Sequence, residues 1–523
     1  MRQSIFLALL ILFYSCKKES KHDYLGVVNL TVTGNAAAKT HFEKGLLLLH
    51  SFEYKDAREA FLKAQEADPT MPMAYWGEAM SYNHSLWSEQ DYESGVAALE
   101  KLKNSNVPTS ITELESDLIA GLDLLYKPKT SKNDRDVAYK DYMKSLFEKY
   151  PSNHEVAAFY ALSLLGSVAE GRDDTVYGMG AKIAQGILKE NAQHPGALHY
   201  LIHSYDDPQH AYMALDAADA YAKVAPDASH ALHMPSHIYV ALGMWDKVIA
   251  SNIDSYQASL NRMEAKKLDN NARGYHAYHW LEYGCLQKNQ IEEAEKMVYD
   301  MQRYCSETPS PVARVHLMFL KGTFLAETNL WDHDIASIPV DVSGLNIGIR
   351  AQNYFIKGMH AFKMKENSNL VAAIDTLSKE ISKEALLADN LNKGFAVCSS
   401  ASRSLPTQSD INEAKIMLMQ LQGLKAWQDN DLEVAETYFK DAVNLHEQMS
   451  YSYGPPFIQK PPMEFYADFL LDQNRPAEAL ALYQKALERG TKRRLALSGV
   501  NKSAMMLGDK TMIEKSSKAL QNI

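Results

Sequence analysis

Histidines between residues 194 and 283 recur at spacings that could bring several imidazole rings together. His199 and His203 are followed 34 residues later by His233 and His237, and His230 stands three residues before His233. Residues three or four apart lie on the same face of a helix, so each set would form a stripe on one helix. Neutral imidazole is the commonest metal ligand and suits zinc, iron, copper and nickel. The spacing therefore indicates a metal or ligand site.

Zinc or iron is the transition metal that we expect if the site holds one. Three histidines, or two with a carboxylate, plus an open position are typical of catalytic zinc and non-haem iron. The candidate ligands are His199, His203, His233, His237 and His279. Metal ligands need hydrogen-bonded neighbours that fix their tautomers. The residues expected to give such support, or to contact a substrate, are His230, His276, Tyr283, Asp206 and Asp207.

The same histidines allow other interpretations. Protonated imidazoles could bind an anionic group, neutral ones could hydrogen-bond a polar ligand, and a buried histidine network could serve only to close a tight superhelix. The sequence contains no H-E-x-x-H, P-loop, dinucleotide or G-x-S-x-G motif. It names neither a general base nor a substrate class, so it leaves open whether the chain is an enzyme.

A recurring pattern of small residues predicts the elements that would position the histidines. The first copy of the pattern consists of Gly45, Ala57, Phe61 and Ala64, followed by Pro69, which stops a helix. Of these residues, Ala57, Phe61 and Ala64 fall on one helical face. The same frame returns at identical spacing at Gly423, Ala435, Phe439 and Ala442. Partial copies occur at Ala214, Ala218, Tyr221 and Pro226, and at Ala479, Tyr483 and Ala486. This repetition predicts pairs of antiparallel helices stacked along the chain.

The pattern resembles the tetratricopeptide repeat, whose unit is 34 residues long, and the resemblance covers most of residues 37–510. It implies an all-α solenoid of helix-turn-helix units; a generic helical bundle is the alternative. In that family, positions 2, 5 and 9 of the first helix face the concave groove where ligands bind. Three units here supply nine such positions, and seven hold histidine, whereas 18 histidines in 523 residues would fill about 0.3 by chance. The segments HPGALHY and HMPSHIY further resemble uncharacterised bacterial tetratricopeptide proteins, which bring no assigned reaction.

The N-terminus resembles a bacterial lipoprotein signal. An apolar run over residues 5–14, too short to span a bilayer, ends in Ser15-Cys16 and a lysine-rich stretch. The resemblance implies that Cys16 carries the lipid, at the bacterial cell envelope on the outer membrane or the periplasmic face. An ordinary cleaved signal with an incidental cysteine is the alternative. We expect a signal peptide over residues 1–15, an anchor and linker over 16–36, and repeats over 37–190, 191–330 (the histidine-rich part) and 331–520.

Composition narrows the classes of partner. A net charge of −11 and a pI near 5.9 argue against nucleic acid, whose phosphates need a basic surface. We therefore expect a membrane-anchored interaction scaffold whose groove binds a protein or a cell-envelope component; the alternative is a metal-binding protein or metal-dependent enzyme. Cys285 and Cys305 could pair; alternatively these two and Cys398 could all be buried as small apolar residues. Three segments interrupt the repeats: residues 130–136, expected as a loop, 259–273, an insertion, and 454–462, which is rich in proline.

Overall fold

The computed structural model describes residues 24–105, 111–169, 171–388 and 406–523. Cys16, the rest of the expected signal and lipidation segment, and Cys398 lie outside these ranges. The expected fold class is confirmed: the chain is an all-α array of tetratricopeptide-like helical hairpins. Within the described residues, no helix has both the length and the apolar character that crossing a bilayer requires.

The elements follow one another along the chain in the order in which they pack. The first half contains α1 (Ala36–His50), α2 (Tyr54–Ala67), α3 (Pro72–Met80), β1 (Asn83–His84), η1 (Ser85–Trp87), β2 (Glu89–Gln90), α4 (Tyr92–Asn104), α5 (Glu113–Leu125), α6 (Lys132–Lys149), α7 (His154–Gly166), α8 (Asp174–Glu190), α9 (Pro195–Ser204), η2 (Ala211–Ala214), α10 (Leu215–Val224), α11 (Ser229–His233), α12 (Pro235–Ala241) and α13 (Trp245–Lys266). The second half contains η3 (Asn270–Ala272), α14 (Tyr275–Gln287), α15 (Ile291–Glu307), α16 (Pro311–Thr328), η4 (Asp334–Ser337), α17 (Ile347–Lys363), α18 (Asn367–Ala388), α19 (Gln408–Gln428), α20 (Leu432–Gln448), α21 (Pro462–Asp472), α22 (Pro476–Arg489), α23 (Arg494–Leu507) and α24 (Lys510–Gln521).

The glycine of the repeat pattern is where two helices of a hairpin touch. A Cβ atom on Gly45 in α1 would lie 2.6 Å from the ring of Phe61 in α2. A Cβ atom on Gly423 in α19 would lie 2.5 Å from the ring of Phe439 in α20. Such contacts are far shorter than packed atoms tolerate, so the aromatic residue of the second helix requires glycine in the first. The recurring spacing in the sequence is thus a packing requirement.

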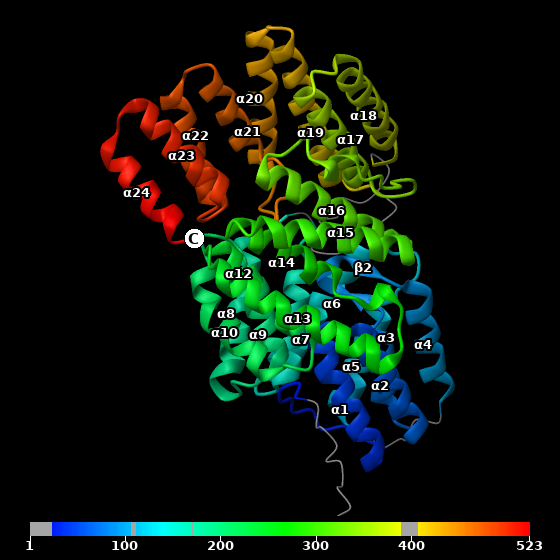
Figure 1. The fold of residues 1–523 in the computed structure, drawn as a ribbon. Coiled ribbons are helices and arrows are strands. Elements are labelled where there is room, and N and C mark those ends of the chain that lie inside the picture. The colour runs from blue at the N-terminus through cyan, green and yellow to red at the C-terminus, as the bar shows by residue number, and fades with distance from the viewer. Residues whose placement is uncertain (1–23, 106–110, 170, 389–405) are drawn as a thin grey trace, which may run out of the picture.

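The array folds back on itself twice instead of remaining an open arc. In the first half, α2 meets α13 where Asp56 accepts a hydrogen bond from Arg262 Nε at 2.8 Å. Between the two halves, Trp245 Nε1 donates to the Lys492 carbonyl at 3.2 Å, which joins α13 to the segment before α23. Figure 1 shows the result: α1–α13 form one lobe, α17–α24 form the other, and α14–α16 lie between them. Positions that would line an open groove are therefore enclosed.

Residues 24–34, which fall within the expected linker, lie extended along the first lobe. Val27 N donates to the Gln193 carbonyl at 2.9 Å, and the backbone amides of Asn29 and Thr33 donate to Glu155 and Glu115. Three apolar side chains of this segment are buried, Leu25, Val28 and Val32, whereas Tyr24 and Val27 are exposed. We call residues 24–34 the N-terminal strap.

The three interrupting segments differ from one another. The prediction of a loop over residues 130–136 was wrong for residues 132–136, because Ser131 caps α6 and the helix begins at Lys132. The insertion at 259–273 is mostly a continuation of α13, followed by η3. The proline-rich segment contains no helix until α21 begins at Pro462. Cys285 and Cys305 are free thiols, Cys285 being buried.

Candidate functional site: two histidine triads

Six of the predicted histidines come together in two groups of three. The first triad consists of His199 and His203 from α9 and His230 from α11. The Nε2 atom of His199 lies 3.1 Å from Nε2 of His203 and 3.2 Å from Nε2 of His230. One ring nitrogen of each of the three histidines lies within 4.8 Å of the others. Three ligand atoms therefore converge on one point between consecutive first helices.

The second triad repeats this construction one unit further along. It consists of His233 from α11, His237 from α12 and His276 from α14, again with ligand nitrogens within 4.8 Å of one another. Among the described residues, the Nε2 atoms of all three lack a hydrogen-bond partner, although they are buried. Buried polar atoms are nearly always paired, so three unpaired nitrogens in one place call for an explanation.

Both triads follow one rule of assembly. Each takes a pair of histidines four residues apart from one unit and a single histidine from the start of the next first helix. A pair at this spacing lies on one helical face, and the next first helix packs beside it. The histidines at position 2 of the repeat, His230 and His276, were expected from the sequence in supporting roles, and the structure groups them with the pairs at positions 5 and 9 of the preceding unit.

The hydrogen bonds of the first triad fix the tautomer of His199. Its Nδ1 lies 2.7 Å from the backbone carbonyl of His50, which can only accept, so Nδ1 carries the proton. The Nε2 of neutral His199 is therefore a lone pair aimed at His203 and His230. The ring of Phe52 covers this triad, with its centroid 4.2 Å from that of His199.

Hydrogen bonds also fix the tautomers of two histidines in the second triad, His233 and His237. His233 Nδ1 donates to Asn252 Oδ1 at 2.7 Å, and the orientation of the Asn252 amide is set because its Nδ2 donates to the Val248 carbonyl. His237 Nδ1 donates to Asp206 Oδ2 at 3.1 Å. Both histidines therefore present unpaired Nε2 lone pairs toward each other and toward His276. Facing lone pairs repel each other unless a proton or a cation lies between them.

Burial disfavours an additional proton, and with it a positive charge, on these imidazoles. His199, His203, His233 and His237 are at most 2% exposed. Burial, followed by the charge of Arg172, lowers the pKa of His203 to about 3, and burial lowers the pKa values of His233 and His237 to about 4. Burial and the neighbouring imidazoles also lower the pKa values of His199, His230 and His276 well below the usual range. All six are neutral near pH 7, which is the state that binds metal.

Asp206 connects the two triads. Its Oδ2 atom accepts from His237 and lies 3.5 Å from Nδ1 of His203, so one buried carboxylate contacts a histidine of each triad. Arg172 approaches the other oxygen at 3.6 Å. Burial raises the pKa of Asp206, while the hydrogen bond from His237 and the charge of Arg172 oppose that effect. A carboxylate behind a ligating histidine is a common arrangement at metal sites.

The remaining predicted site residues lie outside the triads. His279 donates to or accepts from Thr323 Oγ1 at 2.9 Å and stacks on Phe319, while His276 occupies the third place of the second triad. Tyr283 receives a hydrogen bond from Arg493 at 3.1 Å. Asp207 contacts Arg172 and His210 and does not reach a triad histidine.

A third buried cluster, which sequence reasoning did not single out, provides a contrast. His50 Nε2 lies 2.7 Å from Glu155 Oε2, and His194 Nε2 lies 3.2 Å from Glu155 Oε1. His194 Nδ1 accepts from the Ala197 amide, so its Nε2 carries a proton toward the carboxylate. Burial opposes ionisation, yet hydrogen bonds from His194 and His50 hold the pKa of Glu155 far below its usual value. This cluster differs from the triads because a carboxylate lies between its two imidazoles, although the contact of His194 Nε2 with that carboxylate does not have hydrogen-bond geometry.

No protein-family model matches the chain, and neither does any curated protein. Among solved structures, the chain is similar to yeast Tom70, at 12% identity and a TM-score of 0.33, over 91% of this chain and 98% of that one. It is also similar to a human IFIT1 dimer with PPP-AAAA, at 11% identity and a TM-score of 0.38, over 91% of this chain and 94% of that one. At these scores the likeness carries no argument about what this chain binds.

Proposed function

We propose that this chain is a metalloprotein in which the two histidine triads bind transition-metal ions, zinc or iron(II). The observation that carries the proposal is the set of fixed tautomers. His199, His233 and His237 each donate through Nδ1 to an oxygen, and each aims a buried Nε2 lone pair at its triad partners. A cation held by these nitrogens removes the repulsion and pairs the buried acceptors at once.

The distances suit such a cation. Two imidazole nitrogens bound to one zinc at 2.0–2.1 Å in a tetrahedral arrangement lie about 3.3 Å apart. The two measured Nε2–Nε2 separations in the first triad are 3.1 and 3.2 Å. The second triad needs only small side-chain rotations, because its ligand atoms lie within 4.8 Å of one another. Neither triad therefore requires the helices to move.

Three histidine ligands favour a reactive site over a structural one. Structural zinc sites are closed by four protein ligands, whereas three histidines with an open position are typical of catalytic zinc. A metal with an open position supplies a Lewis acid and an activated water. Asp206, behind both triads, would hold the rings of His203 and His237 in place. We infer that the metal serves chemistry on a small molecule, because the site is enclosed.

An interaction role through the concave groove receives less support. Of the seven histidines at groove positions, five are buried and the other two, His230 and His276, are half-buried. Side chains so enclosed cannot form the contact surface of a protein partner, which needs hundreds of Å² of accessible area. A protein or cell-envelope partner would have to use other faces of the array.

Metal analysis tests the proposal. Residues 21–523 are expressed without an affinity tag, purified without chelator, and assayed for metals by mass spectrometry. We expect about two ions per chain, one for each three-histidine site, and a lower melting temperature in EDTA because the metal binds only the folded state. A double variant, His233→Ala with His237→Ala, should lose one ion and keep its helical circular dichroism.

His154→Ala is the matched control, because His154 lies at the surface beside Glu190 at 3.0 Å. It should leave the metal content unchanged. Metal-free protein that neither binds added zinc or iron(II) nor gains stability from them would refute the proposal. Unfolding of the double variant in the absence of any metal would instead favour a purely structural histidine network.

The lipid anchor is a separate proposal and rests on the sequence alone. We infer that Cys16 carries a lipid that holds the protein at the bacterial cell envelope, on the outer membrane or the periplasmic face. Expression of the full chain in bacteria with a labelled fatty acid should label the protein, and Cys16→Ala should remove the label. A wild-type chain without label would show that the segment is an ordinary signal.

A further inference from the structure

A cavity of about 210 Å³ lies beside the second triad, between the two lobes. It is bounded by α14, α16, α19 and α22 and by residues 449–461, which we call the proline loop. A cavity of about 150 Å³ in another protein holds a benzene molecule. The present one therefore has room for a small organic molecule.

The proline loop is held firmly in this place. Gln352 Nε2 donates to the Phe457 carbonyl and Gln420 Nε2 donates to the Lys460 carbonyl, both at 2.8 Å. Gly322 in α16 makes room for the loop, since a Cβ atom there would come within 1.6 Å of Gln459 Nε2. The loop is thus a built wall of the cavity.

Several polar atoms at the wall have no hydrogen-bond partner in the part of the chain that the structure describes. Gln459 is 3% exposed, and among the described residues neither its amide oxygen nor its amide nitrogen makes a hydrogen bond. Gln352 Oε1, Glu464 Oε2 and one terminal nitrogen of Arg493 are also buried without a partner. Buried polar groups are rarely left unpaired, so these atoms indicate that the cavity holds a polar ligand or water.

The charges around the cavity favour an anion. Arg493 is neutralised by Glu464, at 2.5 Å, and by Glu327. Arg489 has no carboxylate within ion-pair distance among the described residues, and its guanidinium makes only long contacts of 3.4 Å to the carbonyls of His446 and Met449. On the opposite side, burial and the charge of Asp410 raise the pKa of Glu413 well above its usual value. Within the described part of the chain, Arg489 is therefore a partly buried cation without a carboxylate at ion-pair distance.

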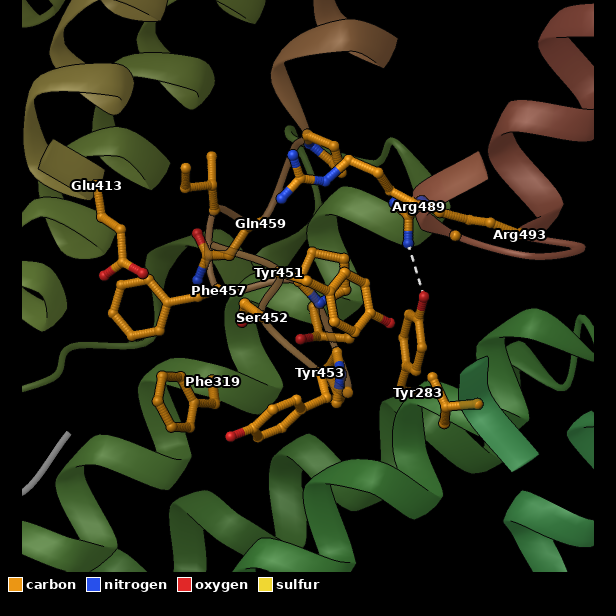
Figure 2. Close-up of a pocket in the computed structure, with 18 of the residues that line it drawn as sticks. Tyr283, Phe319, Glu413, Tyr451, Ser452, Tyr453, Phe457, Gln459, Arg489 and Arg493 are labelled. Carbon is orange, nitrogen blue, oxygen red and sulfur yellow. Dashed lines mark hydrogen bonds between the residues drawn. The ribbon is translucent and has the colours of Figure 1, made fainter. Parts of the chain in front are cut away.

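The rest of the wall is aromatic. Figure 2 shows these rings around the space, with Arg489 and Arg493 on one side and Glu413 on the other: Phe319, Tyr451, Tyr453 and Phe457. Trp280 completes the floor and also touches the second triad, since its ring centroid lies 4.6 Å from that of His237 and 4.9 Å from that of His233. His276 belongs both to the triad and to the cavity wall.

We propose that this cavity binds a small organic acid, with its carboxylate at Arg489 and its apolar or aromatic body between the rings of the proline loop and Trp280. An acid bound in this way lies next to the second triad, where it would be the substrate of the proposed metal site. That last assignment rests on the proposed function, whereas binding in the cavity does not.

Calorimetry with simple probes tests the proposal. Benzoate, phenylacetate and 3-phenylpropionate are titrated into the protein, and benzamide serves as the neutral analogue of benzoate. We expect at least one acid to bind, and benzoate to bind about ten-fold more tightly than benzamide, which is about 1.4 kcal/mol. Binding should also quench the fluorescence of Trp280. The titrations are repeated after EDTA treatment to separate cavity binding from metal binding.

Variants of the arginine complete the test. Arg489→Met should abolish the preference for benzoate over benzamide, and Arg489→Lys should retain part of it. Arg303→Met is the matched control, because Arg303 pairs with Asp300 on the surface of α15 and should leave binding unchanged.

Equal affinity for benzoate and benzamide, absence of binding by all three acids at millimolar concentration, or an unchanged preference in Arg489→Met would overturn the proposal. Acid binding that persists without metal would support the cavity even if the triads prove metal-free. Metal binding without acid binding would leave only the proposed function standing.

Discussion

Asp206 lies directly behind His237, with its Oδ2 atom 3.1 Å from Nδ1 of the imidazole. The carboxylate is buried at the end of α9, and the histidine comes from α12 in the next repeat. Because a carboxylate oxygen accepts, this contact keeps the proton on Nδ1 and leaves Nε2 free for a ligand. The same oxygen approaches Nδ1 of His203, so a single acidic residue influences both triads.

Asp206→Asn is therefore expected to weaken metal binding at both triads without unfolding the protein. Loss of a hydrogen-bonded residue behind a metal ligand typically lowers affinity about 10–100-fold. Competition titration with a chromophoric chelator measures the change. Asp207→Asn is the matched control, because Asp207 contacts Arg172 and His210 and does not reach a triad histidine. Equal effects of both substitutions would contradict this role of Asp206.

The two half-buried histidines separate the sites from each other. His230→Ala removes a ligand from the first triad only, and His276→Ala removes one from the second only. We expect each variant to lower the affinity of one site and to leave about one tightly bound ion per chain, because two histidines remain at the damaged site. Metal analysis after dialysis checks this. Retention of both ions in His276→Ala, with loss in His279→Ala, would return His279 to the ligand role expected from the sequence.

The repeats were predictable because their spacing is a local packing rule. Gly45 and Phe61, like Gly423 and Phe439, mark the contact within one hairpin, and this contact needs no knowledge of distant elements. The grouping of histidines on consecutive first helices followed from the same frame. Closure of the array did not, since it depends on contacts between residues about 200 positions apart, such as Asp56 with Arg262.

The choice between His276 and His279 was also beyond the sequence. The 34-residue offset links α9 to α11 and α12, but the lengthened α13 interrupts the frame before α14. An error of one residue in the repeat frame rotates the predicted inner face of a helix by about 100°. Such a rotation changes which histidine of α14 is expected to point toward the second triad. The cavity beside Trp280 could not be foreseen either, because the proline loop that forms its wall comes from residues 449–461.

The cluster of His50, Glu155 and His194 should matter for stability but not for metal content. Glu155→Gln leaves two buried histidines without their carboxylate, so we expect a loss of about 3–5 kcal/mol. Denaturant unfolding measures the loss, and metal analysis should find the wild-type content. A fall in metal content equal to that of the triad variants would show that this cluster belongs to the metal site.

The contribution of Glu155 to the free energy of unfolding should depend on pH in a definite direction. The folded-state pKa of Glu155 is lowered from an unfolded value of 4.5. A carboxyl group of this kind contributes its stability above the unfolded pKa and loses it as the pH falls. The difference in unfolding free energy between wild type and Glu155→Gln should therefore be constant from pH 7 to about 5 and shrink below the unfolded pKa. A difference that grows on acidification would contradict the assignment.

Two glycine substitutions should have opposite effects on stability. Gly45→Ala places a methyl group 2.6 Å from the Phe61 ring, so α1 and α2 must separate, at a cost of about 1–3 kcal/mol. Gly178 lies in α8 with open space around its Cβ position, so Gly178→Ala should stabilise the helix by about 0.5–1 kcal/mol. Thermal unfolding of both variants tests the packing rule. If Gly45→Ala were as stable as Gly178→Ala, the glycine of the repeat would not be required by the aromatic residue of its hairpin.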